Sequence, residues 1–116
     1  MSDDQTAIAE ITVDEVASRL GSGALLLDVR EDDEWAAGHA GDAVHIPLGA
    51  VADRRAELPA GRTVLCICRM GGRSLKAAAL LSDVGYEVAN VAGGMQVWES
   101  SGRPVVTDDG GAGRVI

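Results

Sequence analysis

The sequence contains no Phe, one Tyr and two Trp, so aromatic residues make up only 3% of its 116 residues. Hydrophobic residues still make up 47% of the chain, and its core must therefore be built from Ala, Val, Leu and Ile. Basic residues are also few, because ten Lys and Arg face eighteen Asp and Glu, a net charge of −8. An acidic chain with few aromatic residues is a poor candidate for binding nucleic acid through its phosphates. We therefore expect no nucleic-acid partner.

Long hydrophobic runs are absent as well, since no stretch approaches the ~18 apolar residues that a membrane span requires. Residues 1–6 contain two Asp and no basic residue, unlike the positively charged start of a secretory signal. We therefore expect no membrane partner and a cytoplasmic location. The length fits a single domain with its own core.

Cysteine is scarce, with Cys66 and Cys68 the only two in the sequence. Two cysteines do not make a disulfide framework, and they do not complete a four-ligand zinc site. The two histidines, His39 and His45, lie far upstream. We therefore expect no metal and no organic cofactor. We also expect the Cys66 and Cys68 side chains to point to opposite faces of a strand, which disfavours a disulfide between them.

Strand-like and helix-like patterns alternate along the chain. Apolar runs predict strands at residues 24–29, 43–46, 63–68 and 87–91. Helical patterns lie at residues 12–20, 32–37, 49–58, 74–84 and 95–101. This alternation predicts an α/β domain with a mainly parallel sheet and helices on both faces. Residues 107–116 carry no core-forming pattern and are expected to form a mobile C-terminal tail.

Charge is unevenly distributed in the second half of the chain. No Asp or Glu occurs between Glu57 and Asp83, an interval that contains Arg62, Arg69, Arg73 and Lys76. A cationic stretch on an acidic protein indicates either an anion site or a solvated helix face that lacks acids by chance. The charge pattern alone leaves both interpretations open.

The segment VLCICRMGGRSL, residues 64–75, carries the candidate chemistry. Cys68 ends a predicted buried strand, and a helix begins near Ser74. In open α/β sheets, ligands bind at the carboxyl ends of the strands, where this loop lies. Gly71 and Gly72 permit positive φ angles, which lets backbone N–H groups converge on one point. Such an environment lowers the pKa of a thiol and predicts that Cys68 is a nucleophile.

Two arginines, Arg69 and Arg73, add full positive charges to this loop. The alternative for Cys68 is a small buried hydrophobe at a strand end, a common place for a free cysteine. The two glycines and two arginines favour the nucleophile. Cys66 lies one position inside the strand, and for it we favour a packing role. The Met70 side chain is expected at the mouth of the site.

Four polar residues upstream of the loop are interpreted mainly as scaffold: Asp28, Arg30, Glu34 and His39. Asp28 ends a buried strand and could accept hydrogen bonds from the loop. Arg30 and Glu34 have the spacing of a simple i,i+4 ion pair. His39 resembles a general base, but a Cys68 thiolate would not need one.

The active-loop pattern C-R-x-G-x-R-S of the rhodanese family resembles residues 68–74, CRMGGRS. The resemblance extends over about residues 8–106. Its other matching motifs, in order, are LLDVR (26–30), EW (34–35), GH (38–39), IPL (46–48), GY (85–86), AGG (92–94), Trp98 and GRPV (102–105). The sequence AGD at 40–42 departs from the turn that is usual in the family.

The resemblance implies a single rhodanese-like domain with a central, mainly parallel five-stranded sheet. It also implies a thiosulfate sulfurtransferase that has Cys68 as its catalytic residue and Asp28 and Arg30 as supporting residues. The substrate-binding residues that it implies are Arg69, Met70, Gly71, Gly72, Arg73 and Ser74.

The implied reaction begins when the Cys68 thiolate takes the outer sulfur of a small anionic donor such as thiosulfate and releases sulfite. The resulting persulfide is then passed to cyanide or to a thiol acceptor. Three other functions stay open: a persulfide carrier in a sulfur-relay pathway, a phosphatase or arsenate reductase with a Cys–Arg loop, and a catalytically inactive binding module. The four residues between Cys68 and Arg73 make the loop one residue shorter than in phosphatases, which disfavours the second.

Overall fold

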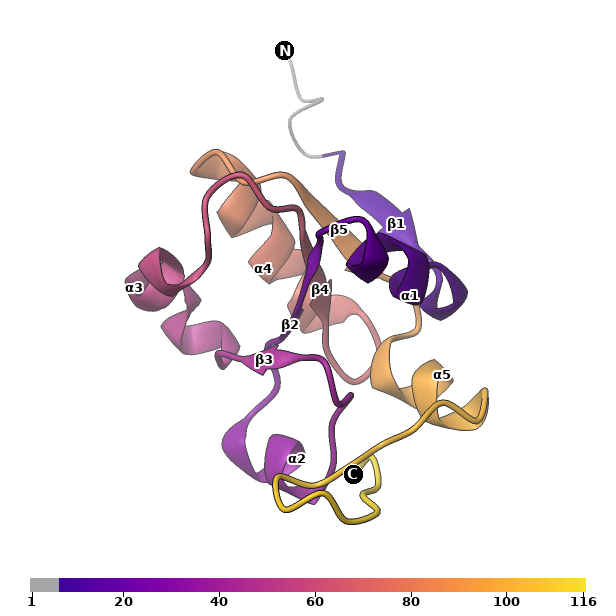
Figure 1. The fold of residues 1–116 in the computed structure, drawn as a ribbon. Helices are drawn as coiled ribbons and strands as arrows, with labels where there is room; N and C mark the ends of the chain where they lie inside the picture. Colours follow the sequence, from indigo (N-terminus) through magenta and orange to yellow (C-terminus); the bar gives the residue numbers. More distant parts are fainter. Residues whose placement is uncertain (1–6) are drawn as a thin grey trace.

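The computed structural model describes residues 7–116 (Figure 1). Strands and helices alternate along the chain, as the hydrophobic pattern predicts. The elements are β1 (Ala9–Ile11), α1 (Val13–Gly21), β2 (Leu25–Asp28), α2 (Asp32–Ala37), β3 (Val44–His45), η2 (Leu48–Ala50), α3 (Val51–Arg54), η3 (Arg55–Glu57), β4 (Val64–Ile67), α4 (Gly72–Asp83), β5 (Val88–Val91) and α5 (Gly94–Ser100).

The five strands form one sheet in the order β1-β5-β4-β2-β3, and every pair is parallel. Strand β4 is central, with Cys66 in register with Leu27 on β2 and with Asn90 on β5. Because all strands are parallel, their carboxyl ends meet at one edge of the sheet. The loop after β4 leaves from the middle of that edge.

Hydrophobic cores lie on both faces of the sheet, as β4 illustrates. Leu65 and Ile67 pack in a cluster with residues from α1 and α5, including Val16 and Met95. Val64 and Cys66 belong to a second cluster that includes residues from α3 and α4. Alternate residues of a strand face opposite sides, so β4 is buried on both. This arrangement confirms the predicted α/β fold with helices on both faces (Figure 1).

Three elements differ from the sequence pattern. Strand β1 was not predicted, because only Ile11 of its three residues is buried. The helix predicted at 49–58 is divided into α3 and two 3₁₀ turns. The helix predicted at 74–84 begins two residues earlier, at Gly72. No helix within residues 7–116 combines the length and hydrophobicity needed to cross a membrane.

The C-terminal segment, residues 107–116, folds back along the edge of the domain near α2 and α5 (Figure 1). Arg114 N–H donates to the Ala37 carbonyl at 2.9 Å, and Val115 N–H donates to a Glu99 carboxylate oxygen at 3.0 Å. Asp108 accepts from His39 Nε2 at 2.9 Å. Most of these contacts are made by backbone groups. Backbone contacts do not depend on hydrophobic side chains, so the sequence pattern does not reveal them. The mobility of this segment stays a prediction.

Candidate active site

Cys68 lies directly after β4, and α4 begins only four residues later. The chain turns sharply between them at Gly71, whose φ of +117° places it in the left-handed region that glycine favours. This turn directs the Gly71 N–H onto Cys68 Sγ at 3.1 Å. Gly71 thus adopts the positive φ that both loop glycines permit, whereas Gly72 is the first residue of α4 and its φ is not positive.

The thiol of Cys68 is almost entirely covered, with 1% of the residue exposed. Burial alone would raise its pKa, but hydrogen bonds to the sulfur outweigh that effect. They come from the Ser74 hydroxyl at 3.2 Å and from the backbone of Ser74, Gly71 and Met70, and together they lower the pKa of Cys68 below its ordinary value. The geometry therefore favours a thiolate held in a small cup of donors.

The start of α5 holds the first part of the loop in place. Met95 N–H donates to the Cys68 carbonyl at 2.8 Å, and Gln96 N–H donates to the Arg69 carbonyl at 2.9 Å. A side chain at Gly94 would meet the Cys68 carbonyl oxygen at 2.3 Å, so only glycine permits this approach. The AGG motif at 92–94, between the neighbouring strand β5 and α5, thus supports the backbone of Cys68 and Arg69.

Arg73 forms a two-pronged ion pair with Glu34 on α2. Its Nη1 and Nη2 lie 2.6 and 2.9 Å from the two carboxylate oxygens of Glu34. The Arg73 guanidinium lowers the pKa of Glu34 to about 2, and Glu34 raises the pKa of Arg73. The i,i+4 spacing of Arg30 and Glu34 therefore does not form an ion pair, because Glu34 pairs with Arg73 and Arg30 pairs with Asp28. Arg73 fixes the second half of the loop to α2, and its charge is largely compensated there.

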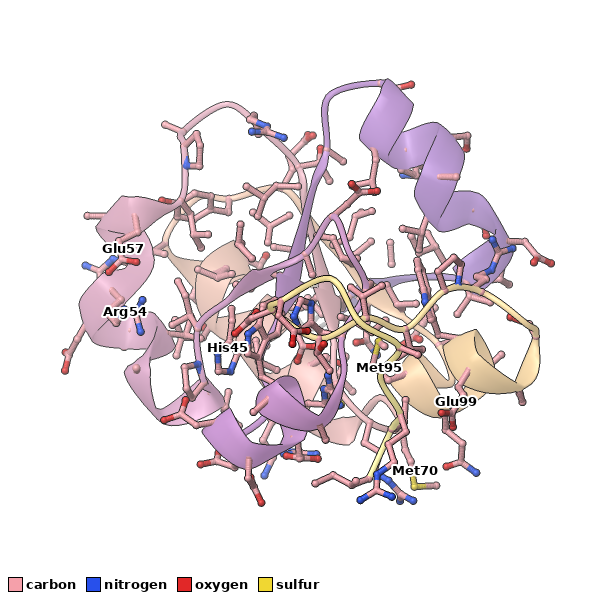
Figure 2. All side chains as sticks on the ribbon, turned by 60° about the horizontal axis from the view of Figure 1, so that its bottom comes forward. His45, Arg54, Glu57, Met70, Met95 and Glu99 are labelled. Atoms are coloured by element: carbon pink, nitrogen blue, oxygen red, sulfur yellow. The ribbon has the colours of Figure 1, made fainter. Side chains whose placement is uncertain are left out.

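Arg69 is the more exposed of the two loop arginines, and it contacts the C-terminal segment. Its Nε donates to the main-chain oxygen of Ile116 at 3.0 Å. Met70 is 62% exposed, and Figure 2 shows it at the surface near the end of that segment. The mouth of the cup is therefore lined by one arginine, one exposed hydrophobic side chain and the C-terminal segment.

Asp28 and Arg30 form a fully buried ion pair at the carboxyl end of β2, each with 0% exposure. Asp28 accepts from the Arg30 backbone N–H, Nε and Nη2 at 2.8–3.0 Å. Arg30 Nη2 also donates to the Gly38 carbonyl at 2.8 Å. These bonds tie the end of β2 to the chain that follows α2. No hydrogen bond joins Asp28 to the active loop within residues 7–116.

Asn90 and Glu10 are two residues of the site region that the sequence analysis missed. Asn90 Oδ1 lies 2.6 Å from the Ser74 hydroxyl oxygen, and its amide group donates to the Gly71 carbonyl and to Glu10. The available signal was a polar residue inside the apolar run 87–91. An amide buried in an interior strand requires partners, and two of the partners here, Ser74 and Gly71, also contact Cys68 Sγ.

Cys66 shares a face with Cys68, contrary to the expectation that they point apart. Both belong to the core cluster beside α3 and α4. Residues two apart in a strand face the same side, which the expectation overlooked. A separation of two extended residues, about 6.6 Å between Cα atoms, still lies at the upper limit for a disulfide. Both thiols are free, and burial raises the pKa of Cys66 to about 12.

These opposite pKa shifts predict selective alkylation of Cys68. Iodoacetamide near neutral pH should modify Cys68 and leave Cys66 unmodified, because only the thiolate reacts. Peptide mapping after limited labelling would locate the adduct. The Cys66→Ala variant should keep the labelling rate and lose about 1 kcal/mol of stability from its smaller side chain. Preferential labelling of Cys66 would contradict the assignment.

The donors of the cup converge on a single sulfur atom. A surface hollow of about 500 Å³ does occur in the structure, but residues such as Leu25 and Arg62 line it, at the amino ends of the strands. At the opposite edge, Cys68 lies within a short loop whose donors converge on one atom. A compact anion that brings one atom to the sulfur fits this arrangement better than an extended substrate.

The fold and the loop together define a class: a parallel α/β domain in which a buried cysteine at the end of the central strand accepts hydrogen bonds from the loop that follows. The model of the rhodanese-like domain matches residues 12–101. The chain belongs to this family, as its sequence motifs indicate.

Relatives and solved structures agree with that assignment. The chain is similar to a sulfurtransferase of Allochromatium vinosum, with 36% identity over 89% of this chain and 99% of the relative. It also resembles the thiosulfate sulfurtransferase GlpE of Pseudomonas entomophila, with 34% identity over 78% of this chain and 84% of the relative. The structure of a rhodanese-related protein from Thermoplasma volcanium matches with a TM-score of 0.80 and 29% identity, covering 86% of this chain and 99% of that one.

Proposed function

We propose that this protein is a thiosulfate sulfurtransferase that works through a persulfide on Cys68. The observation that carries the proposal is the convergence of the Gly71 N–H and the Ser74 hydroxyl on Cys68 Sγ. A sulfur anion at this position is stabilised by donors that are already in place. The sulfurtransferases among its relatives support the same reaction class.

The reaction proceeds in two half-reactions. The Cys68 thiolate attacks the outer sulfur of thiosulfate, an S–S bond forms to Cys68, and the bond to the sulfonate sulfur breaks with its electron pair on sulfite. An acceptor, cyanide or a thiolate, then attacks the outer sulfur and returns Cys68 as thiolate. Dividing one transfer into two predicts ping-pong kinetics. Neither half-reaction requires a metal or an organic cofactor.

The seven residues of the loop, 68–74, divide this work between them. Cys68 carries the transferred sulfur as a persulfide. The backbone and hydroxyl donors of Met70, Gly71 and Ser74 stabilise the Cys68 thiolate. Gly72 begins α4 and brings the positive end of the helix close to the site. Arg69 and Arg73 bind the sulfonate, with Arg69 as the more available charge because Glu34 already engages Arg73.

Replacing Arg69 by Ala should raise the KM for thiosulfate about tenfold, since a charge-assisted hydrogen bond to the sulfonate is lost. The dependence of KM on salt should weaken, while kcat changes less. Initial-rate kinetics at two salt concentrations measure both effects. Arg55→Ala, which removes an exposed arginine from η3 far along the sequence, is the matched control. An unchanged KM in Arg69→Ala would refute a donor-binding role for Arg69.

A sulfur-relay carrier is the second candidate, and one observation favours it. Met70 is 62% exposed directly beside the nucleophile, where a partner protein would contact it. In that function the persulfide on Cys68 would be the same, and the acceptor would be a protein thiol.

One experiment distinguishes the proposed sulfurtransferase from a sulfur-relay carrier and from a phosphatase. Sulfite release from thiosulfate is measured with cyanide, with a small thiol, and with no acceptor, and hydrolysis of an aryl phosphate is measured in parallel. A sulfurtransferase releases sulfite continuously with acceptor, and a carrier releases one equivalent that small acceptors do not accelerate. Phosphate release without sulfite release would instead indicate a phosphatase and contradict the proposal.

A further inference from the structure

A buried chain of polar side chains leads from Cys68 through α4 and β5 to the edge strand β1. Ser74 on α4 is completely buried, and Asn90 on β5 is 3% exposed. The Ser74 hydroxyl oxygen lies 3.2 Å from Cys68 Sγ and 2.6 Å from Asn90 Oδ1. The Ser74 hydroxyl therefore links Cys68 and Asn90 in one hydrogen-bond chain.

The Ser74 hydroxyl has one proton and more than one acceptor within reach. When Cys68 is a neutral thiol, its S–H donates to the Ser74 oxygen while Ser74 donates to Asn90 Oδ1, and every group is paired. When Cys68 is a thiolate, the hydroxyl turns its proton to the sulfur, because hydrogen bonds to an ion are stronger. Asn90 Oδ1 then faces an oxygen lone pair 2.6 Å away with no proton between them.

The orientation of the Asn90 amide follows from its other neighbours. Its Nδ2 lies 3.1 Å from the Gly71 carbonyl oxygen and 3.2–3.3 Å from the two carboxylate oxygens of Glu10. All three atoms are acceptors, so the NH₂ group must face them and Oδ1 must face Ser74. Glu10 therefore prevents the amide from rotating to donate a hydrogen bond to Ser74.

We propose that Asn90 is a positioning residue that competes with Cys68 for the Ser74 proton. It thereby favours the states in which Sγ carries no charge, the thiol and the persulfide, over the thiolate. In the persulfide the negative charge resides on the outer sulfur, and the Ser74 hydroxyl returns to Asn90. Only rotation about the Ser74 Cβ–Oγ bond is needed, and no covalent bond changes.

This competition affects both steps of the transfer, because it changes the stability of the Cys68 thiolate. A thiolate that is stabilised too strongly is a weak nucleophile, and the optimum lies where its pKa is near the ambient pH. The Gly71 N–H and the helix start both stabilise the thiolate. Asn90 opposes them, which retains reactivity in the first half-reaction and stabilises the loaded enzyme before the second. The persulfide part of this inference depends on the proposed function, whereas the competition for the proton does not.

The test is the pH titration of Cys68, followed by thiolate absorbance or by the alkylation rate. Asn90→Leu removes the competing acceptor, so the pKa of Cys68 should fall by about 0.5–1 pH unit, the equivalent of one hydrogen bond. Ser74→Ala should raise it. Loosening of the loop would also raise it, so a purely structural role for Asn90 predicts the opposite sign. Leu75 N–H still donates to the Gly71 carbonyl in Asn90→Leu and keeps the loop attached to α4.

A double-mutant comparison isolates the pathway through Ser74. In a Ser74→Ala background, Asn90→Leu should leave the pKa of Cys68 unchanged. The surface variant Glu10→Gln releases the amide without a change in the core, and it should also lower this pKa when Ser74 is present but not when Ser74 is Ala. The other charged groups of the site, Arg69, Arg73 and Glu34 as the partner of Arg73, are unaltered in all of these variants.

The amount of persulfide provides a second readout. At a fixed ratio of thiosulfate to sulfite, the persulfidated fraction of Cys68 should fall several-fold in Asn90→Leu. An unchanged or raised pKa in both Asn90→Leu and Glu10→Gln, or an equal fall in both Ser74 backgrounds, would overturn the proposal. If thiosulfate proves not to be the donor, the titration still decides the role of Asn90, so the two failures are distinguishable.

Discussion

The Cys68→Ser variant is expected to lose sulfur transfer from thiosulfate by at least about 10³-fold, the scale of loss when an essential nucleophile is removed. A serine hydroxyl is not ionised near neutral pH and does not form a persulfide. The surrounding donors at Gly71 and Ser74 stay in place, so the variant should fold and still bind anions. Sulfite release with cyanide as acceptor measures the loss.

Cys66→Ser is the matched control, because it makes the same chemical change two residues away. It places a hydroxyl in an apolar environment and should cost stability, yet leave kcat nearly unchanged. Comparable activity losses in the two variants, or a fully active Cys68→Ser enzyme, would contradict the assignment of Cys68 as nucleophile.

Asp28→Ala is expected to lower the free energy of unfolding by about 3–5 kcal/mol, because it leaves the Arg30 guanidinium buried without its counterion. Both side chains have 0% exposure, and Asp28 accepts hydrogen bonds from Nε and Nη2 of the Arg30 guanidinium. Urea unfolding at neutral pH measures the change. Asp53→Ala on α3 removes an exposed carboxylate and should change the stability by less than about 0.5 kcal/mol.

The Asp28 result also separates a structural role from a catalytic one. If the pair acts only as scaffold, the folded fraction of Asp28→Ala should bind thiosulfate with a KM close to that of the wild type. A loss of stability below about 1 kcal/mol would contradict the structural role of this buried pair.

The fold was predictable because its signals are local. Four of the five strands and helix α4 follow from hydrophobic patterns within short segments, and parallel pairing follows from the alternation of strands with helices. Strand β1 carries too little signal, since Ala9 and Glu10 are exposed and only Ile11 is buried. Its place beside β5 results from tertiary pairing that three residues do not encode on their own.

The candidate site was predictable only where it is continuous in sequence. Residues 68–74 lie in one segment, so their glycines, arginines and cysteine could be considered together. The partners of that segment come from other elements: Glu34 is 39 positions from Arg73, and Asn90 is 16 positions from Ser74. Both pairings depend on the sheet order, which places α2 and β5 on either side of the loop after β4.

The error over Cys66 had a different origin. Side chains alternate along a strand with a period of two residues, so positions two apart share a face. The resulting picture is of two buried thiols in one core, distinguished by their donors. Cys68 receives hydrogen bonds from the loop, whereas burial without such bonds raises the pKa of Cys66 to about 12.

The most direct test of this account is the mass of the protein after incubation with thiosulfate and removal of excess reagent. We expect one added sulfur atom per chain, located on Cys68 by peptide mapping without reduction and removed by cyanide. The Cys66→Ala variant should gain the same mass, and Cys68→Ser should gain none. Sulfur on Cys66, a Cys66–Cys68 disulfide in its place, or an unchanged mass would contradict the persulfide mechanism.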